Sequence, residues 1–208
     1  MSMQTDFINS VLPGAMAIQK RTSIPAAVMI AQAIQETGWG RYVTKDMNTG
    51  RNSYNLFNIK GSGPAGYVTA RTWEVYNGKT VTINANFRAY HNYEESFNDY
   101  AALIAGTKRY APAMAVKHNP EEFARKIHQC GYATDPNYSK TLISIMRTWS
   151  LVEKTKEVEE VPKWMKNIMQ EAKAIGLINS DHNPNEPATK WFVLAVALNV
   201  IKVIRGGK

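Results

Sequence analysis

The chain has 208 residues, 44% of them hydrophobic, which is enough for one domain with a buried core, or for one domain and a small module. Its formal net charge of +8 suits an anionic partner, whether nucleic acid, anionic lipid or a cell wall that carries acidic polymers. A single cysteine excludes an internal disulfide, and the sequence contains no RNP motif or paired zinc ligands that would indicate a nucleic-acid partner.

The ends of the chain carry no targeting pattern that we identify. The first ten residues, MSMQTDFINS, lack the basic start and apolar run of a secretory signal peptide. The longest apolar run, 191–204, is too short to span a bilayer and contains Asn199 and Lys202. We therefore expect a soluble protein that is made in the cytoplasm and does not insert into membranes.

Two helices are predicted before residue 40. The first covers Thr5 to Lys20, with an expected kink where Pro13 and Gly14 interrupt it. The second lies in Ile24 to Gly40, IPAAVMIAQAIQETGWG, where Ser23 is expected to cap the start and Gly38 to end the helix in a left-handed conformation. Its nearly continuous apolar run predicts burial on most sides.

Glu36 lies in the last turn of this second helix and shares a face with Met29, Gln32 and Ala33. Apolar neighbours and the negative end of the helix dipole both disfavour the ionised carboxylate, so we expect a raised pKa. A carboxyl group that stays protonated near neutral pH suits a general acid. The alternative is an ordinary surface glutamate near a helix end.

From Arg41 to Tyr90 the helical periodicity disappears and a β-hairpin is predicted. Tyr67 to Tyr76 and Thr80 to Tyr90 are the strands, and Asn77-Gly78 is the turn. Side chains alternate between the two faces, so Glu74 lies on the face opposite Trp73. From the residues alone, Glu74 is most simply a solvated strand residue.

Three further helices are predicted before residue 150, and the rest of the chain forms a linker and a helical module. The helices begin at Asn92, at Asn119-Pro120 and at Asp135-Pro136. Residues 151–161 are a charged linker or an exposed helical connector. Residues 162–208 predict two amphipathic helices, the first ending near Gly176 and the second covering Pro187 to Ile204.

Three motifs together carry a family resemblance. AQAIQETGWG contains Glu36 and Gly38, YNLFNIKG covers Tyr54 to Gly61, and YATDPNY ends at Tyr138. In this order they resemble glycoside hydrolase family 73, whose members are peptidoglycan N-acetylglucosaminidases with a lysozyme-like fold. The resemblance runs from about residue 6 to about residue 149. It implies an α+β, mostly helical catalytic domain over residues 1–150, with a small β-hairpin lobe.

The resemblance also implies roles for individual residues. Glu36 would be the general acid, and Glu74 would be a second acidic group that orients or deprotonates water or stabilises the transition state. Tyr132 would hold the water or the N-acetyl group. The candidate substrate-binding residues, each of which has core packing or loop structure as its alternative, are Asn55, Phe57, Tyr90 and Tyr138.

The implied substrate is the peptidoglycan glycan strand, and the expected setting is a phage endolysin, with an autolysin as the alternative. The C-terminal module, residues 162–208, weakly resembles a surface-layer-homology repeat. It is therefore a wall anchor for secondary wall polymers, a dimer contact, or a helical hairpin that packs on the catalytic domain. The oligomeric state stays open, as does the choice between an inverting, retaining or substrate-assisted mechanism.

Three other functions compete with this interpretation. A muramidase or lytic transglycosylase would cut the other glycosidic bond, and a non-catalytic wall-binding protein would not cut at all. A peptidase or amidase built on Cys130 with His118 or His128 is disfavoured, because a helix C-terminus does not stabilise a thiolate. The four histidines have no paired spacing, so we expect no metal and no cofactor.

Overall fold

The structure is a computed structural model, and it describes residues 2–76, 78–156, 163–176, 178, 196, 200 and 201. The chain divides into two compact units, Met1–Lys156 and Glu157–Lys208. In the second unit, α8 (Lys163–Ala174) matches the first helix of the predicted module. The predicted second helix of the module, over 187–204, lies almost entirely outside the described residues.

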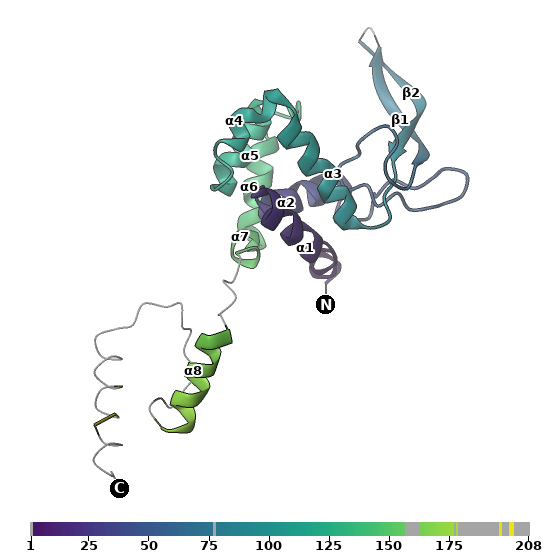
Figure 1. Cartoon of the computed structure of the whole chain (residues 1–208). Coiled ribbons are helices and arrows are strands. Elements are labelled where there is room, and N and C mark those ends of the chain that lie inside the picture. The colour runs from purple at the N-terminus through teal and green to yellow at the C-terminus, as the bar shows by residue number, and fades with distance from the viewer. Residues whose placement is uncertain are drawn as a thin grey trace. The chain divides into compact units, whose positions relative to one another are not determined.

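The first unit is mostly helical, with one antiparallel hairpin, as the sequence predicts (Figure 1). The hairpin consists of β1 (Tyr67–Tyr76) and β2 (Lys79–Arg88). The long helices are α1 (Met3–Thr22), α2 (Ala26–Thr37), α3 (Tyr93–Gly106), α5 (Pro120–Gln129) and α6 (Tyr138–Thr148). Two short elements were not anticipated from sequence, namely the 3₁₀ turn Lys108–Tyr110 and α4 (Ala111–Met114). A third, α7 (Leu151–Lys154), lies in the segment predicted as a linker or helical connector.

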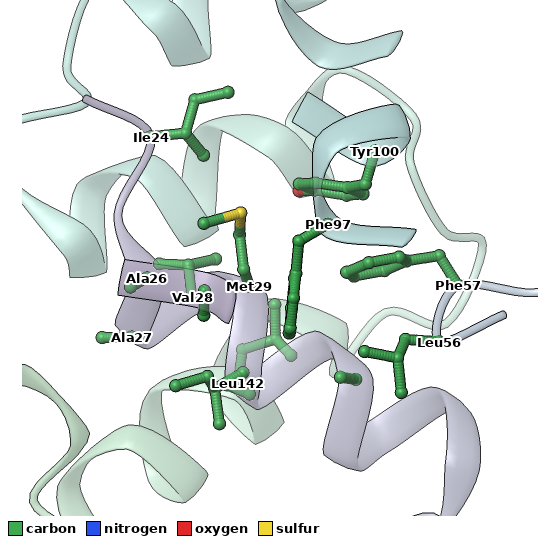
Figure 2. Close-up of a cluster of buried hydrophobic side chains, with 14 of the residues drawn as sticks. Ile24, Ala26, Ala27, Val28, Met29, Leu56, Phe57, Phe97, Tyr100 and Leu142 are labelled. Atoms are coloured by element: carbon green, nitrogen blue, oxygen red, sulfur yellow. The ribbon is translucent and has the colours of Figure 1, made fainter. Parts of the chain in front are cut away.

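Helix α2 is the centre of the core, because ten of its 12 residues are buried. Figure 2 shows Met29 of α2 in one cluster with Phe97 and Tyr100 of α3 and with Phe57 from the preceding loop. Phe57 stacks on Tyr100 with ring centroids 4.2 Å apart. Because such aromatic contacts add to the burial of apolar area, they fix the loop firmly against the helices.

The junction between α1 and α2 differs from the prediction. Ser23 does not cap α2; it closes α1 in a left-handed conformation, with φ 60° and its N–H donating to the Gln19 carbonyl. The free N–H of Ala26 instead donates to Gln19 Oε1 at 2.7 Å. The two helices follow each other so closely that Ser23 is the C-cap of α1 and cannot cap α2. The Gln19 side chain of α1 accepts the N–H at the start of α2 instead.

Helix α1 also continues through Pro13 without the predicted interruption. At Gly14 it approaches α3 closely, since a Cβ atom added there would lie 3.1 Å from the Cα of Glu94. The helix predicted to begin at Asp135-Pro136 begins at Tyr138, without a side-chain cap. Three other helix ends follow the sequence signals. Gly38 ends α2 with φ 54°, and the side chains of Asn92 and Asn119 accept the N–H groups of Glu95 and Glu122.

The hairpin has the predicted strands, with β2 ending two residues early at Arg88. One of its faces is packed, through Val68, Phe87 and Ala89. The base of β1 is held by Asp46, whose Oδ2 accepts the Thr69 N–H at 2.9 Å. Hydrogen bonds from Thr69 and from the Asp46 loop itself lower the pKa of the Asp46 carboxyl to about 2.

Asn55 organises the loop that leads into the hairpin. Its side chain is fully buried, and its Nδ2 donates to the carbonyls of Ile59 and Arg88 at 2.9 and 3.0 Å. Its Oδ1 accepts the N–H groups of Phe57 and Ile59 at 3.3 and 3.1 Å. One amide therefore satisfies four main-chain groups and ties the loop to β2.

The first unit extends beyond the predicted boundary at residue 150. Leu151 is fully buried, Thr155 is nearly so, and Gln19 Nε2 donates to the Thr155 carbonyl at 2.9 Å. The segment 151–155 thus packs as part of this unit, because one apolar side chain in a charged stretch finds a place in the core. Within the part of the chain that the structure describes, no helix is both long and apolar enough to cross a membrane.

We predict that Asn55→Ala lowers the free energy of unfolding of the first unit by about 2–4 kcal/mol, because buried main-chain groups lose their partners. Urea denaturation measures the change. Asn48→Ala, which removes an exposed amide from a neighbouring loop, is the control and should change the value by less than about 0.5 kcal/mol. Equal effects from both variants would contradict the structural role of Asn55.

Candidate active site

Glu36 lies in the last turn of α2, just before the chain turns through Gly38. Its side chain is half-buried, and burial raises the pKa of its carboxyl above the usual value, as the sequence predicts. Hydrogen bonds from Tyr138 and Asn58 act in the opposite direction and offset part of this rise. The result is a partly accessible carboxyl group that holds its proton to higher pH than an exposed glutamate does.

A chain of hydrogen bonds runs from α3 through α2 and α6 to this carboxyl. Tyr100 Oη donates to Gln32 Oε1 at 2.5 Å, and Gln32 Nε2 donates to Tyr138 Oη at 3.0 Å. Tyr138 Oη in turn donates to Glu36 Oε1 at 3.3 Å. Gln32 and Tyr100 are fully buried and Tyr138 is 3% exposed, so the chain lies almost wholly inside the protein.

The contacts give this chain one consistent direction of hydrogen bonding. Burial, together with the Glu36 carboxylate, raises the pKa of the Tyr138 phenol, so this group stays protonated and acts as a donor toward Glu36. With Oε1 accepting from Tyr138, Oε2 is the oxygen left to carry the acidic proton of Glu36. Gln32, which the sequence offered only as a neighbour on the same helix face, is the central link.

Asn58 is a second contact that sequence reasoning missed. Its Nδ2 donates to the main-chain carbonyl of Glu36 at 3.4 Å, and its Oδ1 accepts from Thr44 Oγ1 at 3.1 Å. Its φ of 51° is left-handed, a conformation that asparagine tolerates better than most residues. The available signal was its position inside the YNLFNIKG motif, between two residues that carry the family resemblance.

Tyr132 lies beside the partners of Glu36. Its ring stacks on Tyr138 with centroids 5.8 Å apart and meets Tyr100 edge-on at 6.0 Å. Burial, and the nearby negative charge of Glu36, raise the pKa of the Tyr132 phenol well above its usual value. The Tyr132 ring therefore packs against the tyrosines that lead to Glu36, and its phenol stays neutral.

All four candidate substrate-binding residues are buried. Asn55 is fully buried, Phe57 is 5% exposed and Tyr90 is 2% exposed. The Tyr90 hydroxyl donates to Asp99 Oδ2 at 2.6 Å, and Arg88 forms an ion pair with the same carboxylate at 2.7 Å. These side chains shape the loop and anchor the hairpin to α3, whereas Tyr138 reaches the carboxyl of Glu36 directly.

Glu74 lies near the end of β1, where its backbone pairs with Val81. The structure describes the backbone of Glu74 but not its side chain. The hairpin therefore carries the second candidate acid as a strand residue, and its role remains the one that the family resemblance implies.

Other candidate chemistry lies elsewhere. A hollow of about 610 Å³ between α5 and α6 is lined by His128, Lys140 and Arg147 among others, but not by Glu36. Cys130 caps α5 and is half-buried, while His128 contacts Ser139 through Nδ1 at 3.2 Å. Over the described ranges, no group of three His, Cys, Asp or Glu side chains could hold a metal ion.

We predict that Tyr138→Phe raises the pKa of Glu36 further. The Tyr138 hydroxyl stabilises the ionised carboxylate, and the variant lacks this donor. A carboxyl carbon NMR titration measures the shift. The variant should also lose about 1–3 kcal/mol of stability, since the Gln32 amide loses its acceptor. Tyr42→Phe, at a tyrosine that is 71% exposed, is the control and should change neither quantity. A Glu36 pKa that falls or stays constant in Tyr138→Phe would contradict the hydrogen-bond chain.

Comparison with known proteins identifies the family. The family model described as mannosyl-glycoprotein endo-beta-N-acetylglucosaminidase, or glucosaminidase, matches residues 12–151. The peptidoglycan hydrolase FlgJ of Pseudomonas aeruginosa is 38% identical over 144 residues, which cover 68% of this chain and 36% of FlgJ. The exo-glucosaminidase LytG of Bacillus subtilis is 34% identical over 170 residues, covering 79% of this chain and 57% of LytG.

Solved structures agree with this result. The catalytic domain of the autolysin Auto from Listeria monocytogenes has a TM-score of 0.64 at 32% identity, covering 74% of this chain and 88% of that domain. A mutant peptidoglycan hydrolase from Sphingomonas sp. A1 has a TM-score of 0.60 at 37% identity, covering 72% and 96%. The chain spans less than half the length of its FlgJ relatives from Pseudomonas and Vibrio. It belongs to the glucosaminidase family, glycoside hydrolase family 73, and its first unit is a glycoside hydrolase domain of that family.

Proposed function

We propose that this protein hydrolyses the β-1,4 bond between N-acetylglucosamine and N-acetylmuramic acid in peptidoglycan, with Glu36 as the general acid. The observation that carries the proposal is the state of the Glu36 carboxyl, which is half-buried, has a raised pKa and accepts a hydrogen bond from Tyr138. A group of this kind can donate a proton near neutral pH, where an exposed glutamate is ionised.

The arrangement supports one specific proton transfer. The proton on Oε2 of Glu36 moves to the glycosidic oxygen as the bond to the leaving sugar breaks. Tyr138 stays on Oε1 and stabilises the carboxylate that forms, so the same contact serves the group before and after the transfer. General acid catalysis of this kind contributes about 10²–10⁴-fold to the rate.

Glu74 is the proposed second acidic group, and Tyr132 is the proposed donor to the attacking water or to the N-acetyl group. Family membership supports both assignments, and the stacking of Tyr132 on Tyr138 supports the second. Glu74 deprotonates or orients water, or stabilises the oxocarbenium-like transition state; the separation of the two carboxyl groups distinguishes an inverting from a retaining enzyme.

The proposed substrate matches the relatives and the charge of the chain. Several relatives carry the name peptidoglycan hydrolase or autolysin, and a net charge of +8 favours approach to a wall with acidic groups. We propose a lytic role, as a phage endolysin or an autolysin. The second unit, Glu157–Lys208, is proposed as a module that binds secondary wall polymers or a second copy of the chain.

Product analysis tests the reaction. We predict that purified peptidoglycan digested by the protein and reduced with borohydride yields reduced N-acetylglucosamine, identified by mass spectrometry. Glu36→Gln should lower the turnover by about 10²–10⁴-fold, because the amide cannot donate the proton. The substitution keeps the size of the side chain, and an unchanged melting temperature confirms that the variant is folded.

Other products distinguish the rival functions. Reduced or anhydro N-acetylmuramic acid would assign the protein to the muramidases or lytic transglycosylases. An absence of new sugar ends with retained sedimentation on the wall would leave a non-catalytic binding protein. Full activity of Glu36→Gln would overturn the role of this residue while leaving the substrate assignment intact.

Glu74→Gln tests the second acid. We predict a fall in turnover of about 10²-fold or more with little change in stability, since Glu74 lies near the end of the hairpin. Lys79→Gln, at the position that pairs with Tyr76 near the hairpin turn, is the matched control and should keep nearly full activity. An inert Glu74→Gln would support a mechanism with one carboxyl group, as in many lytic transglycosylases.

A further inference from the structure

The outer face of the β-hairpin has an unusual composition for solvent-exposed sheet. Trp73 is 75% exposed and Tyr67 is 50% exposed, although both are large aromatic side chains. The register pairs Trp73 with Thr82 and Arg71 with Asn84, and directly paired residues share a face. Arg71, Thr82 and Asn84 are also exposed. We call these five residues, Tyr67, Arg71, Trp73, Thr82 and Asn84, the aromatic strip.

Burial of the opposite face explains how the strip is held. Val68, Ala70, Ala85 and Phe87 alternate with the strip residues and pack in a small core of their own. This core fixes the twist and register of the two strands, so the strip residues keep their spacing although they are exposed. Figure 1 shows the hairpin extending away from the helices of the first unit, so the strip is open to a large ligand.

The chemistry of the strip suits an extended, polar polymer. Tyr67 and Trp73 are six residues apart on β1, which places them about 20 Å from each other. An amide, a hydroxyl and a guanidinium group lie between or beside them. Aromatic rings stack on the apolar face of a sugar, amides and hydroxyls bond to its hydroxyl and acetamido groups, and Arg71 can pair with a carboxylate.

We propose that the aromatic strip binds a peptidoglycan glycan strand as a surface separate from the Glu36 site. This inference rests on the proposed substrate. Trp73 and Glu74 are adjacent on β1, and adjacent positions of a strand belong to opposite faces. The face that carries the proposed second acid is therefore not the face of the strip, and the strip holds a neighbouring segment or strand of the wall rather than the bond that is cut.

Charge favours glycan with peptide carboxylates over a neutral polysaccharide. The strip contains one cation and no anion, and the chain as a whole carries a net charge of +8. The stem peptides of peptidoglycan present carboxylates along an extended sugar chain, which matches a cation placed between two aromatic rings. A membrane surface is the competing occupant, because tryptophan and arginine also suit lipid headgroups.

Sedimentation with insoluble peptidoglycan tests the proposal. The full chain carries Glu36→Gln so that the wall is not digested, and the wall is stripped of secondary polymers. We expect Trp73→Ala to bind about 3- to 10-fold more weakly, the loss of one aromatic stacking contact, and Tyr67→Ala to show a similar fall. Trp73→Phe should keep part of the affinity. Leu103→Ala, which removes an exposed apolar side chain from α3, is the control and should bind like the parent.

Two further measurements separate the possible outcomes. Melting temperatures of the variants should equal that of the parent, because exposed side chains support little of the fold. Phosphatidylglycerol vesicles test the membrane alternative. Two results overturn the strip as a glycan site. One is wall binding by Trp73→Ala that equals that of the parent. The other is weaker binding of Trp73→Ala to vesicles but not to peptidoglycan.

The proposal and the proposed function fail separately. Suppose that the unsubstituted protein releases no new sugar ends and that Trp73→Ala binds the wall more weakly. This result overturns hydrolysis and retains the strip as part of a binding protein. Release of reduced N-acetylglucosamine with unchanged wall binding by Trp73→Ala retains the enzyme and overturns the strip.

Discussion

The hydrogen-bond chain from Tyr100 to Glu36 is the interaction on which both the fold and the site depend. It connects α3, α2 and α6, and its middle link, the Gln32 side chain, has no access to water. A buried amide of this kind is costly unless it is hydrogen-bonded, and among the described residues no buried side-chain polar atom lacks a partner. The position of the Glu36 carboxyl is thus set by the requirement that Gln32 be satisfied, and the same requirement fixes how the three helices pack.

This arrangement links the proposed chemistry to stability. Burial raises the pKa of Glu36, so the folded protein binds this proton more tightly than the unfolded chain does. The group therefore favours folding while it is protonated, and that contribution is lost as the pH rises from the unfolded value through the raised folded value. Keeping this carboxyl partly buried costs stability once it is ionised. The buried side chains of α2 offset that cost, and they take no part in the proposed reaction. The rest of this core helix contributes more stability than its one buried carboxyl, the proposed general acid, removes.

The sequence predicts what short-range patterns decide. The buried helix, its end at Gly38, the two strands of the hairpin and the caps at Asn92 and Asn119 all follow from neighbours within a few residues. Long-range contacts account for two of the differences. Leu151 is buried in the core that also contains α2, far from it in sequence, and Gln32 bonds to Tyr100 and Tyr138, which lie 68 and 106 residues away. The use of Ser23 by α1 is a local difference, since its N–H bonds to Gln19. No periodicity in the sequence reports these pairings, so the hydrogen-bond chain was visible only in the folded unit.

The hairpin shows how one short sheet can serve two purposes. Its base is tied to α3 through Arg88, which pairs with Asp99, and Tyr90 donates to the same carboxylate. Asp99 precedes Tyr100, the first member of the hydrogen-bond chain, so the anchor of the hairpin and the support of Glu36 lie on consecutive residues of one helix. A displacement of the hairpin base is therefore resisted by the helix that also positions the carboxyl. With its base fixed in this way, the alternation of the strand can present the proposed second acid on one face and the aromatic strip on the other, and binding of a polymer by the strip holds the wall in a defined place relative to Glu36.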